Sequence, residues 1–217
     1  MDDKPALSVR GVSCLEVPPD LARFTVSVSS RHADRRTALE VLSARSDGIR
    51  EVIDAAGPAV EKRESGGLHL WPETGADGDA IRAYAGSVTT SVVVNDFAVL
   101  GDLMVRLALR EQCHVAGPYW QLRPDSEHAA EARRAAVRDG LRRARQYADS
   151  LGARIDSLVD LTDTAEDSYG PVPPPAATAE HGEPHPELPS FDVELRPLTV
   201  RAEVRLRVTI TTPDLSG

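Results

Sequence analysis

The stretch that decides the fold is PDSEHAAEARRAAVRDGLRRARQYADSLG, residues 124–152, which is predicted to form the longest helix. Asp125 or Ser126 can cap its first turn, because a short side-chain oxygen accepts hydrogen bonds from the free backbone N–H groups there. Gly152 follows the last turn, as a C′ glycine does. Apolar residues at seven-, four- and three-residue steps predict one buried stripe. This stripe consists of Ala130, Val137, Leu141, Ala144, Ala148 and Leu151.

Two further faces of this helix have their own composition. Ala132, Ala136 and Gly140 form a strip of small residues, which lets another backbone come close. The third face carries arginines interleaved with acids (Arg134, Arg138, Arg142 and Arg145, with Glu127, Glu131 and Asp149). Such a face could follow a phosphate backbone. It could equally be a solvated surface held by ion pairs such as Arg145 with Asp149, and the acidic chain favours this second interpretation.

The composition is that of a soluble globular protein, with 217 residues, 41% hydrophobic and 27% charged. The formal charge of −9 argues against nucleic acid and anionic membranes as partners. No stretch approaches the roughly 18 apolar residues of a spanning helix, so we expect no membrane insertion. The start, MDDKPALSVRG, lacks the basic and apolar regions of a signal peptide. We therefore expect a cytoplasmic location, or export if a signal has been trimmed.

Alternation of apolar and polar residues predicts strands on both sides of the long helix. Residues 7–17 and 24–29 alternate, and Pro18-Pro19-Asp20 between them predicts a hairpin. Pro118 indicates that the strand at 115–122 lies at a sheet edge, and Gly66-Gly67 indicates a bulge or a point where another backbone comes close. The cleanest alternation covers residues 198–210. The remaining predicted elements are helices at 34–56 and 97–107 and strands at 60–71, 84–94 and 155–161.

These elements follow the order β-β-α-β-β-α-β-α-β-loop-β, which favours the α+β class. We expect one domain over residues 1–217, with a largely antiparallel sheet of about seven strands and three helices packed on one face. A Pro-rich acidic loop at 163–197 interrupts it. Arg201, Arg205 and Arg207 alternate on the outer face of the last strand. They could bind an anion, but a charged edge or wet sheet face that discourages aggregation is the favoured interpretation.

Several stretches together resemble the SIMPL-domain family. Residues 7–28, LSVRGVSCLEVPPDLARFTVSV, are similar to its V-x-G-x-G and V-x-P-D-x-A patterns. Val9, Gly11, Val17, Pro19, Asp20 and Ala22 match, and Ser13 replaces the second glycine. SGGLHLWP at 65–72, the segment from Tyr84 to Leu103, and residues 132–161 continue the likeness. Pro118 departs from the pattern, because an apolar strand residue is expected there.

The resemblance implies an α+β protein of a family whose members are often exported in Gram-negative bacteria. It also implies a loose connection with oxidative-stress tolerance and, in animals, with signalling through a kinase partner. It brings no established catalytic residues, so Gly11, Pro19, Asp20 and Ala22 are interpreted as structural. The side chain of Asp20, after two prolines, can hydrogen-bond the turn backbone.

Few residues suggest chemistry. His181 and His185, in HGEPHPE, are weak metal-ligand candidates, because two prolines forbid a helix and no third rigid ligand is apparent. Trp71, Tyr84 and Trp120 are candidates for a pocket, with core filling as the favoured alternative. Cys14 and Cys113 could sense oxidants, form a disulfide with each other, or be two small apolar residues.

The leading hypothesis is therefore a non-enzymatic protein of SIMPL type without a cofactor. It would self-associate as a homo-oligomer, or hold a protein partner, through a sheet edge or the proline-rich loop. The alternative is a small-molecule or metal-binding enzyme that uses the aromatic cluster and the loop histidines.

Overall fold

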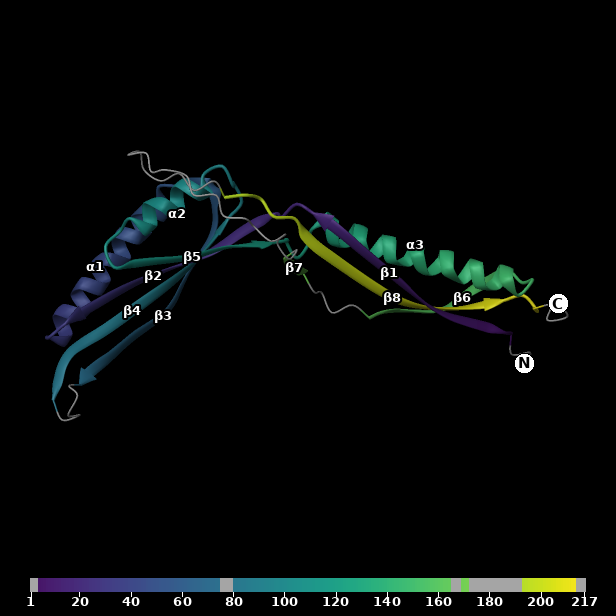
Figure 1. Cartoon of the computed structure of the whole chain (residues 1–217), viewed down its shortest axis with the longest axis horizontal. Helices are drawn as coiled ribbons and strands as arrows, with labels where there is room; N and C mark the ends of the chain where they lie inside the picture. Colours follow the sequence, from purple (N-terminus) through teal and green to yellow (C-terminus); the bar gives the residue numbers. More distant parts are fainter. Residues whose placement is uncertain (1–3, 75–79, 165–168, 172–192, 214–217) are drawn as a thin grey trace, which may run out of the picture. The chain divides into compact units, whose positions relative to one another are not determined.

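The computed structural model of the chain describes residues 4–74, 80–164, 169–171 and 193–213. Over these residues it contains three α-helices and two antiparallel sheets, so the α+β class is confirmed (Figure 1). The single sheet of about seven strands is wrong, because the strands divide into two separate four-stranded sheets. A 3₁₀ turn, Gly57–Ala59, and a short strand, β7 (Tyr169–Pro171), are present that the sequence did not suggest.

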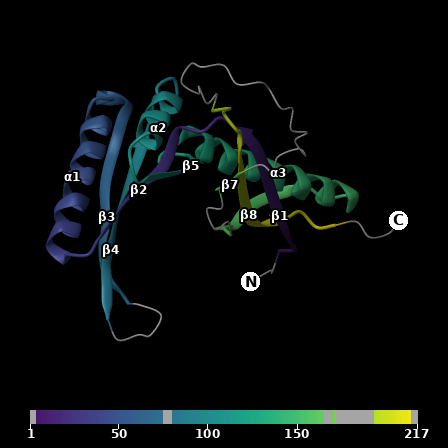
Figure 2. The ribbon, with the colours of Figure 1, turned by 60° about the vertical axis from the view of Figure 1, so that its left-hand side comes forward.

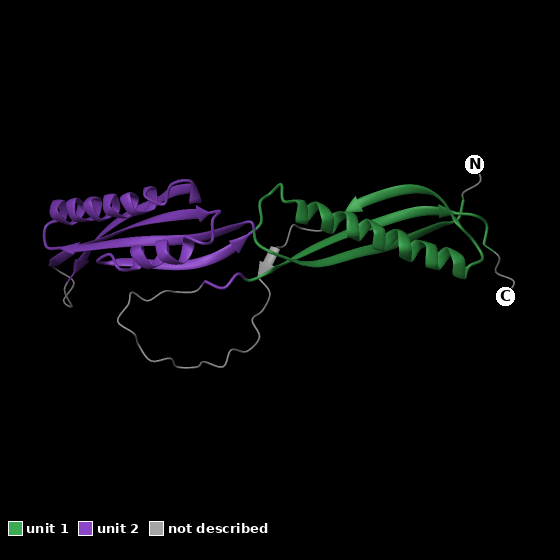
Figure 3. Cartoon of the chain, turned by 90° about the horizontal axis from the view of Figure 1, so that it is seen from above, with its two compact units in different colours: residues 1–19, 122–175, 196–217 green, residues 20–121, 176–195 purple. Residues whose placement is uncertain are grey.

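The chain forms two compact units, each with its own sheet (Figure 3). Unit 1 comprises residues 1–19, 122–175 and 196–217, and unit 2 comprises residues 20–121 and 176–195. The predicted N-terminal hairpin is wrong. Strand β1 (Ala6–Val17) pairs with β8 in unit 1, whereas β2 (Leu21–His32) pairs with β4 and β5 in unit 2. Pro18 and Pro19 have no N–H to donate, so they interrupt the ladder where the chain passes from one sheet to the other.

Unit 1 is built around its last strand. Strand β8 (Leu198–Ile210) lies between β1 on one side and β6 (Ile155–Asp163) and β7 on the other. The predicted strand at 198–210 is confirmed, with every second residue buried from Leu198 to Ile210. Helix α3 (Glu127–Ser150) covers that apolar face. Because β8 is central, Arg201, Arg205 and Arg207 lie on its exposed face rather than at an edge of the sheet.

Helix α3 packs through small residues. Its buried positions recur at steps of three and then four residues and are Ala129, Ala132, Ala136, Gly140, Ala144 and Ala148. The predicted stripe is therefore only partly right, since Val137 and Leu141 are half-buried. The reason is the closeness of the backbones. A Cβ added to Gly11 of β1 would lie 2.6 Å from the Gly140 nitrogen and would also collide with the Ala136 carbonyl oxygen. Only small residues fit where helix and strand backbones touch.

The two ends of α3 differ in how their backbone groups are satisfied. Ser126 occupies the N-cap, but its side chain caps nothing and its buried Oγ has no hydrogen-bond partner. At the other end, Gly152 has a φ of 63°. The Ala153 N–H donates to the Ala148 carbonyl at 2.9 Å and the Gly152 N–H to the Asp149 carbonyl at 3.0 Å. This is a Schellman motif, so the predicted C′ glycine is confirmed.

Unit 2 has the sheet order β3-β4-β2-β5, with β3 (Val60–Thr74), β4 (Ile81–Val94) and β5 (Cys113–Gln121). Helices α1 (Arg35–Asp54) and α2 (Leu100–Ala108) pack on it (Figure 2). The Asp34 carboxylate caps α1 by accepting from the Thr37 N–H at 2.8 Å. The core between helices and sheet is mostly aliphatic, with Phe97 and Trp120 packed against it. Its buried residues include Phe24, Val92, Leu42, Ile53, Leu100, Leu103 and Leu107.

Two irregularities shape the edges of this sheet. Strand β5 pairs only with β2, so the edge position predicted from Pro118 is confirmed. The register of β3 with β4 shifts between Ser65 and Leu68, which confirms the bulge predicted at Gly66-Gly67. The register of β2 with β5 also shifts, between Arg23 and Thr25. Each shift leaves a residue of the edge strand without a ladder partner, so both edge strands of unit 2 are interrupted.

We predict that Gly11→Ala destabilises unit 1 by about 1–3 kcal/mol. The added methyl group would collide with backbone atoms, which cannot move aside as a side chain can. Gly48→Ala in α1 is the matched control, since nothing lies within 4 Å of an added Cβ there. It should stabilise α1 by about 0.5–1 kcal/mol through helix propensity. Urea denaturation followed by circular dichroism measures both, and an unchanged midpoint for Gly11→Ala would contradict the packing described.

Candidate functional site

The three aromatic residues of the predicted pocket do not converge. Trp120 lies opposite Ala22 in the register, and Tyr84 lies opposite His32. Ten residues of β2 separate these positions, or about 33 Å at 3.3 Å per residue. Trp71 is opposite Ala85, the residue after Tyr84, so Trp71 and Tyr84 point to opposite faces of the sheet.

Each aromatic residue has a surrounding of its own. Trp120 packs edge-on against Phe97, with ring centroids 5.1 Å apart and an interplanar angle of 82°. This contact belongs to the core of unit 2, in agreement with core filling as its role. Trp71 is 46% exposed on β3.

The predicted metal ligands His181 and His185 lie outside the described residues. Within the parts of the chain that the structure describes, no group of three or more His, Cys, Asp or Glu side chains could hold a metal ion. In those same parts, no helix is long and apolar enough to cross a membrane.

The two cysteines have different surroundings. Cys14 is exposed on β1 of unit 1, opposite Arg201 of β8. Cys113 is half-buried on β5 of unit 2, where desolvation raises the pKa of its thiol. Since the thiolate is the reactive form, Cys113 is the poorer nucleophile on this ground.

The motif residues shared with the family occupy structural positions. Gly11 makes the strand–helix contact in unit 1, and Pro19 is buried. The Asp20 N–H donates to the Gln121 carbonyl at 3.0 Å, which ties the start of β2 to the end of β5. Ala22 is completely buried.

Asp139 of α3 blocks the outer edge of β1. Its carboxylate accepts from the Val12 N–H at 3.1 Å, on the edge of β1 that faces away from β8. The same carboxylate binds the guanidinium groups of Arg142 and Arg143, the latter at 2.8 Å. The hydrogen bond from Arg142, followed by those from Val12 and Arg143, lowers the pKa of Asp139 below its ordinary value. The carboxylate thus supplies a strand with a hydrogen-bond partner that a further strand would otherwise provide.

The opposite edge of this sheet is open. Among the residues that the structure describes, β6 pairs only with β8, and α3 contacts β1 and β8 extensively but β6 barely. Most of β6 is exposed, including three large apolar side chains: Leu158 at 55%, Val159 at 51% and Leu161 at 43%. Leu158 and Leu161 lie opposite the buried Val208 and Leu206, so they extend the apolar face of the sheet beyond the helix. We call residues 158–161 the open edge.

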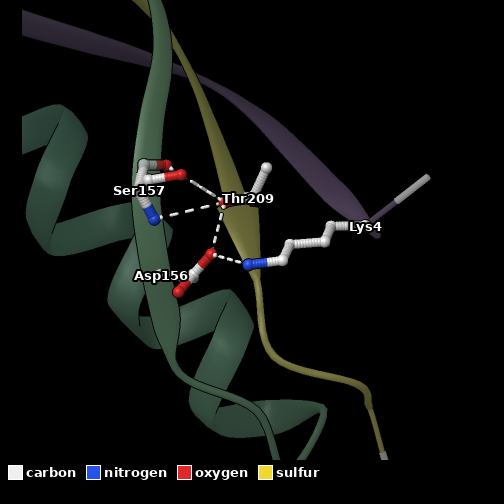
Figure 4. A network of polar contacts seen from close by, with 4 residues as sticks. All are labelled: Lys4, Asp156, Ser157 and Thr209. Atoms are coloured by element: carbon white, nitrogen blue, oxygen red, sulfur yellow. Dashed lines mark hydrogen bonds and ion pairs between the residues drawn. The ribbon is translucent and has the colours of Figure 1, made fainter. Parts of the chain in front are cut away.

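A polar network fixes the beginning of β6. The Asp156 carboxylate accepts from Lys4 Nζ at 2.8 Å and from the Thr209 hydroxyl at 3.2 Å (Figure 4). The hydroxyl groups of Ser157 and Thr209 are 2.7 Å apart. Lys4 lies just before β1, so this network joins the first and last parts of unit 1. The open edge therefore begins at a well-anchored point.

The comparisons with known proteins place the chain in one family. Residues 7–211 match the family model described as SIMPL, a protein of unknown function (DUF541). The chain therefore belongs to the SIMPL family, as the resemblance implied, and the match includes residues of both compact units.

Two curated relatives share the name "26 kDa periplasmic immunogenic protein", one from Brucella melitensis and one from Brucella abortus. Each is 26% identical over 196 residues, which cover 83% of this chain and 74% of the relative. The expected cytoplasmic location is wrong on this evidence, because both relatives are named as periplasmic proteins. The composition of residues 1–11 does not determine the compartment, because a protein is directed to its compartment by a targeting segment and not by its folded part.

We predict that Asp139→Asn destabilises unit 1 by about 1–2 kcal/mol, because a charged acceptor of a backbone N–H and two arginines is lost. The effect depends on pH. A carboxyl group whose pKa is lowered by folding stabilises the protein fully above its ordinary pKa, about 3.9, and this contribution disappears as pH falls through the lowered value. Denaturation midpoints of the two proteins should differ at pH 7 and converge at acidic pH.

Proposed function

We propose that this SIMPL-family chain is a non-enzymatic protein that self-associates through the open edge of β6. The observation that supports the proposal is the open edge itself: three half-exposed apolar side chains on a strand with one ladder side unpaired. An unpaired strand edge offers a row of N–H and C=O groups to another strand. Adding a strand supplies main-chain hydrogen bonds, and apolar side chains beside the ladder supply further stabilisation.

The other edges of the two sheets are less suited to strand addition. Asp139 already bonds the outer edge of β1. Pro118 lacks an N–H on β5. Strand β3 is exposed, but its register shifts three times and charged side chains follow one another at its beginning. Charges and irregularities of this kind are common protection of sheet edges.

The charges of β6 bear on which strand it would meet. Asp160 lies within the open edge, so pairing β6 with β6 of a second copy would bring carboxylates together, which is unfavourable. We propose instead that β6 meets a different surface of another copy, so that these carboxylates do not face one another. Because such a contact joins different surfaces, it produces a ring or an open chain rather than a two-fold dimer.

We predict that the double variant Leu158→Lys, Leu161→Lys lowers the mass of the assembly to that of a single chain. Lysines on an edge strand retain a charge that would be desolvated on pairing. Leu109→Lys is the matched control, because Leu109 is 60% exposed at the end of α2. Sedimentation velocity of the wild-type protein and both variants gives the masses. A wild-type protein that is a single chain at all concentrations, or an unchanged mass in the double variant, would refute the proposal.

The location and the physiological role follow the relatives and the family. We propose that the chain works in the periplasm, as its named relatives do, and that it supports tolerance to oxidants. Fractionation of the native cells should recover it with periplasmic markers. A deletion strain should survive peroxide less well than its parent, and recovery with cytoplasmic markers together with normal survival would contradict both parts.

A further inference from the structure

The two helices of unit 2 cover one face of its sheet, and small polar side chains occupy the other. Alternate residues of the two central strands, such as Phe24 of β2 and Val92 of β4, belong to the core beneath α1 and α2. The residues between them point to the opposite face, because successive side chains of a strand alternate. Six hydroxyl residues lie there in three cross-strand pairs, and all six are partly exposed. We call them the hydroxyl patch, and they are Thr25 with Ser91, Ser27 with Thr89, and Ser29 with Ser87.

An exposed aromatic ring lies at each end of the hydroxyl patch. Trp71 of β3 is opposite Ala85, which comes next to the patch on this face of β4, and the tryptophan is 46% exposed. Tyr119 of β5 is opposite Arg23, which comes next to the patch on this face of β2, and the tyrosine is 56% exposed. Side chains that are opposite one another in a ladder share a face of the sheet. Both rings therefore lie on the face of the hydroxyl patch.

The charged side chains around the patch are largely matched with one another. Two ion pairs lie on this face: Arg31 with Glu73 at 2.7 Å, and Lys62 with Glu64 at 2.6 Å. The Arg23 guanidinium donates to the Gln121 amide oxygen at 3.3 Å. Acids and bases are thus interspersed, and neither sign of charge dominates the face. Its charge is complementary to a partner that has no net charge and forms many hydrogen bonds.

We propose that this face of unit 2 binds an uncharged, linear glycan that lies over the hydroxyl patch between Trp71 and Tyr119. A sugar ring has C–H groups on its flat sides and hydroxyl groups at its rim. The C–H groups can stack on an aromatic ring, whose face carries the negative part of its quadrupole. The rim hydroxyls can bond to the serine and threonine hydroxyls of the patch, each of which both donates and accepts.

The spacing of the two rings favours a chain of sugars over a single sugar. The β2 residues level with Tyr119 and Trp71 are Arg23 and Arg31. They are eight residues apart, or about 26 Å at 3.3 Å per residue. A β-1,4-linked chain is extended and ribbon-like, so it can follow a sheet surface over this length. An α-1,4-linked chain coils, and we expect it to fit poorly.

A second protein sheet is the less favoured occupant of this face. Sheets that pack face to face interdigitate the side chains of their inner faces to form a core. The hydroxyl patch offers little apolar area for such a core, because its side chains are serines and threonines. A nucleic acid could also stack on the rings, but its phosphates would meet the carboxylates of Glu64 and Glu73.

The test is isothermal titration calorimetry of the full-length protein with two uncharged β-1,4-linked glycans, chitohexaose and cellopentaose, and with maltohexaose for comparison. We expect binding to at least one β-linked glycan and much weaker binding to maltohexaose. Trp71→Ala should weaken the binding about tenfold or more, as loss of a stacking ring does. Trp71→Phe keeps a ring and should retain part of the affinity, which separates stacking from any effect on folding.

The matched control is Leu68→Ala on the same strand. Leu68 is 59% exposed and lies opposite Val88, which packs against the core, so it points to the helix side of the sheet. This variant should bind like the wild-type protein. Failure of both β-linked glycans to bind at millimolar concentration would overturn the proposal. So would equal affinity for maltohexaose, or equal losses in Trp71→Ala and Leu68→Ala.

Tryptophan fluorescence gives an independent measurement of the same contact. The chain has two tryptophans, Trp71 and Trp120. In the variant Trp120→Phe only Trp71 emits, and its emission should move to shorter wavelength when the glycan covers it. An emission that does not change at saturating glycan would contradict stacking at Trp71. The inference does not rest on self-association, because β6 belongs to the other unit, and Trp71→Ala should sediment with the wild-type mass.

Discussion

The contact on which unit 1 depends is the one between the backbones of β1 and α3 at Gly11. Side chains normally separate a helix backbone from the sheet that it covers, but here both elements carry a glycine at the meeting point, Gly11 and Gly140. A strip of alanines around Gly140 extends this contact along the helix. Asp139, one position before Gly140, then reaches the Val12 N–H. The contact therefore fixes the position of α3 over β1 and closes the outer edge of that strand.

A helix held over β1 and β8 barely contacts β6. The sheet extends one strand beyond its cover, and the apolar side of that strand remains in solvent at Leu158 and Leu161. The surface proposed to bind a second copy is thus a consequence of where α3 is seated, because it is left uncovered beside the helix.

Much of the local structure could be predicted from the sequence, because it depends on neighbouring residues. The alternation at 198–210, the C′ glycine at Gly152 and the edge proline at Pro118 all act within a few positions along the chain. The predictions that were wrong concern features that depend on contacts between residues far apart in the sequence. Pro18-Pro19 ends a strand whether the chain returns as a hairpin or enters another sheet. Hydrophobicity ranks Val137 and Leu141 above alanine and glycine, yet the approach of β1 decided which side of the helix is buried.

The candidate site was less predictable than the fold. Trp71, Tyr84 and Trp120 suggested a pocket, and the strand register separates them, which no local pattern could show. The open edge was missed as a specific site, although residues 155–161 were predicted as a strand. The three apolar residues Leu158, Val159 and Leu161 are visible in the sequence. That their side chains are exposed becomes evident only once the position of α3 is known.

The central claim is that the seating of α3 leaves β6 free to pair with another copy of the chain. Hydrogen–deuterium exchange of the intact protein at a series of concentrations tests it most directly. If the claim holds, amide protection in peptides covering residues 155–163 rises with protein concentration, while peptides from the edge strand at residues 113–121 exchange at a constant rate. Exchange at residues 155–163 that is fast and independent of concentration would contradict it.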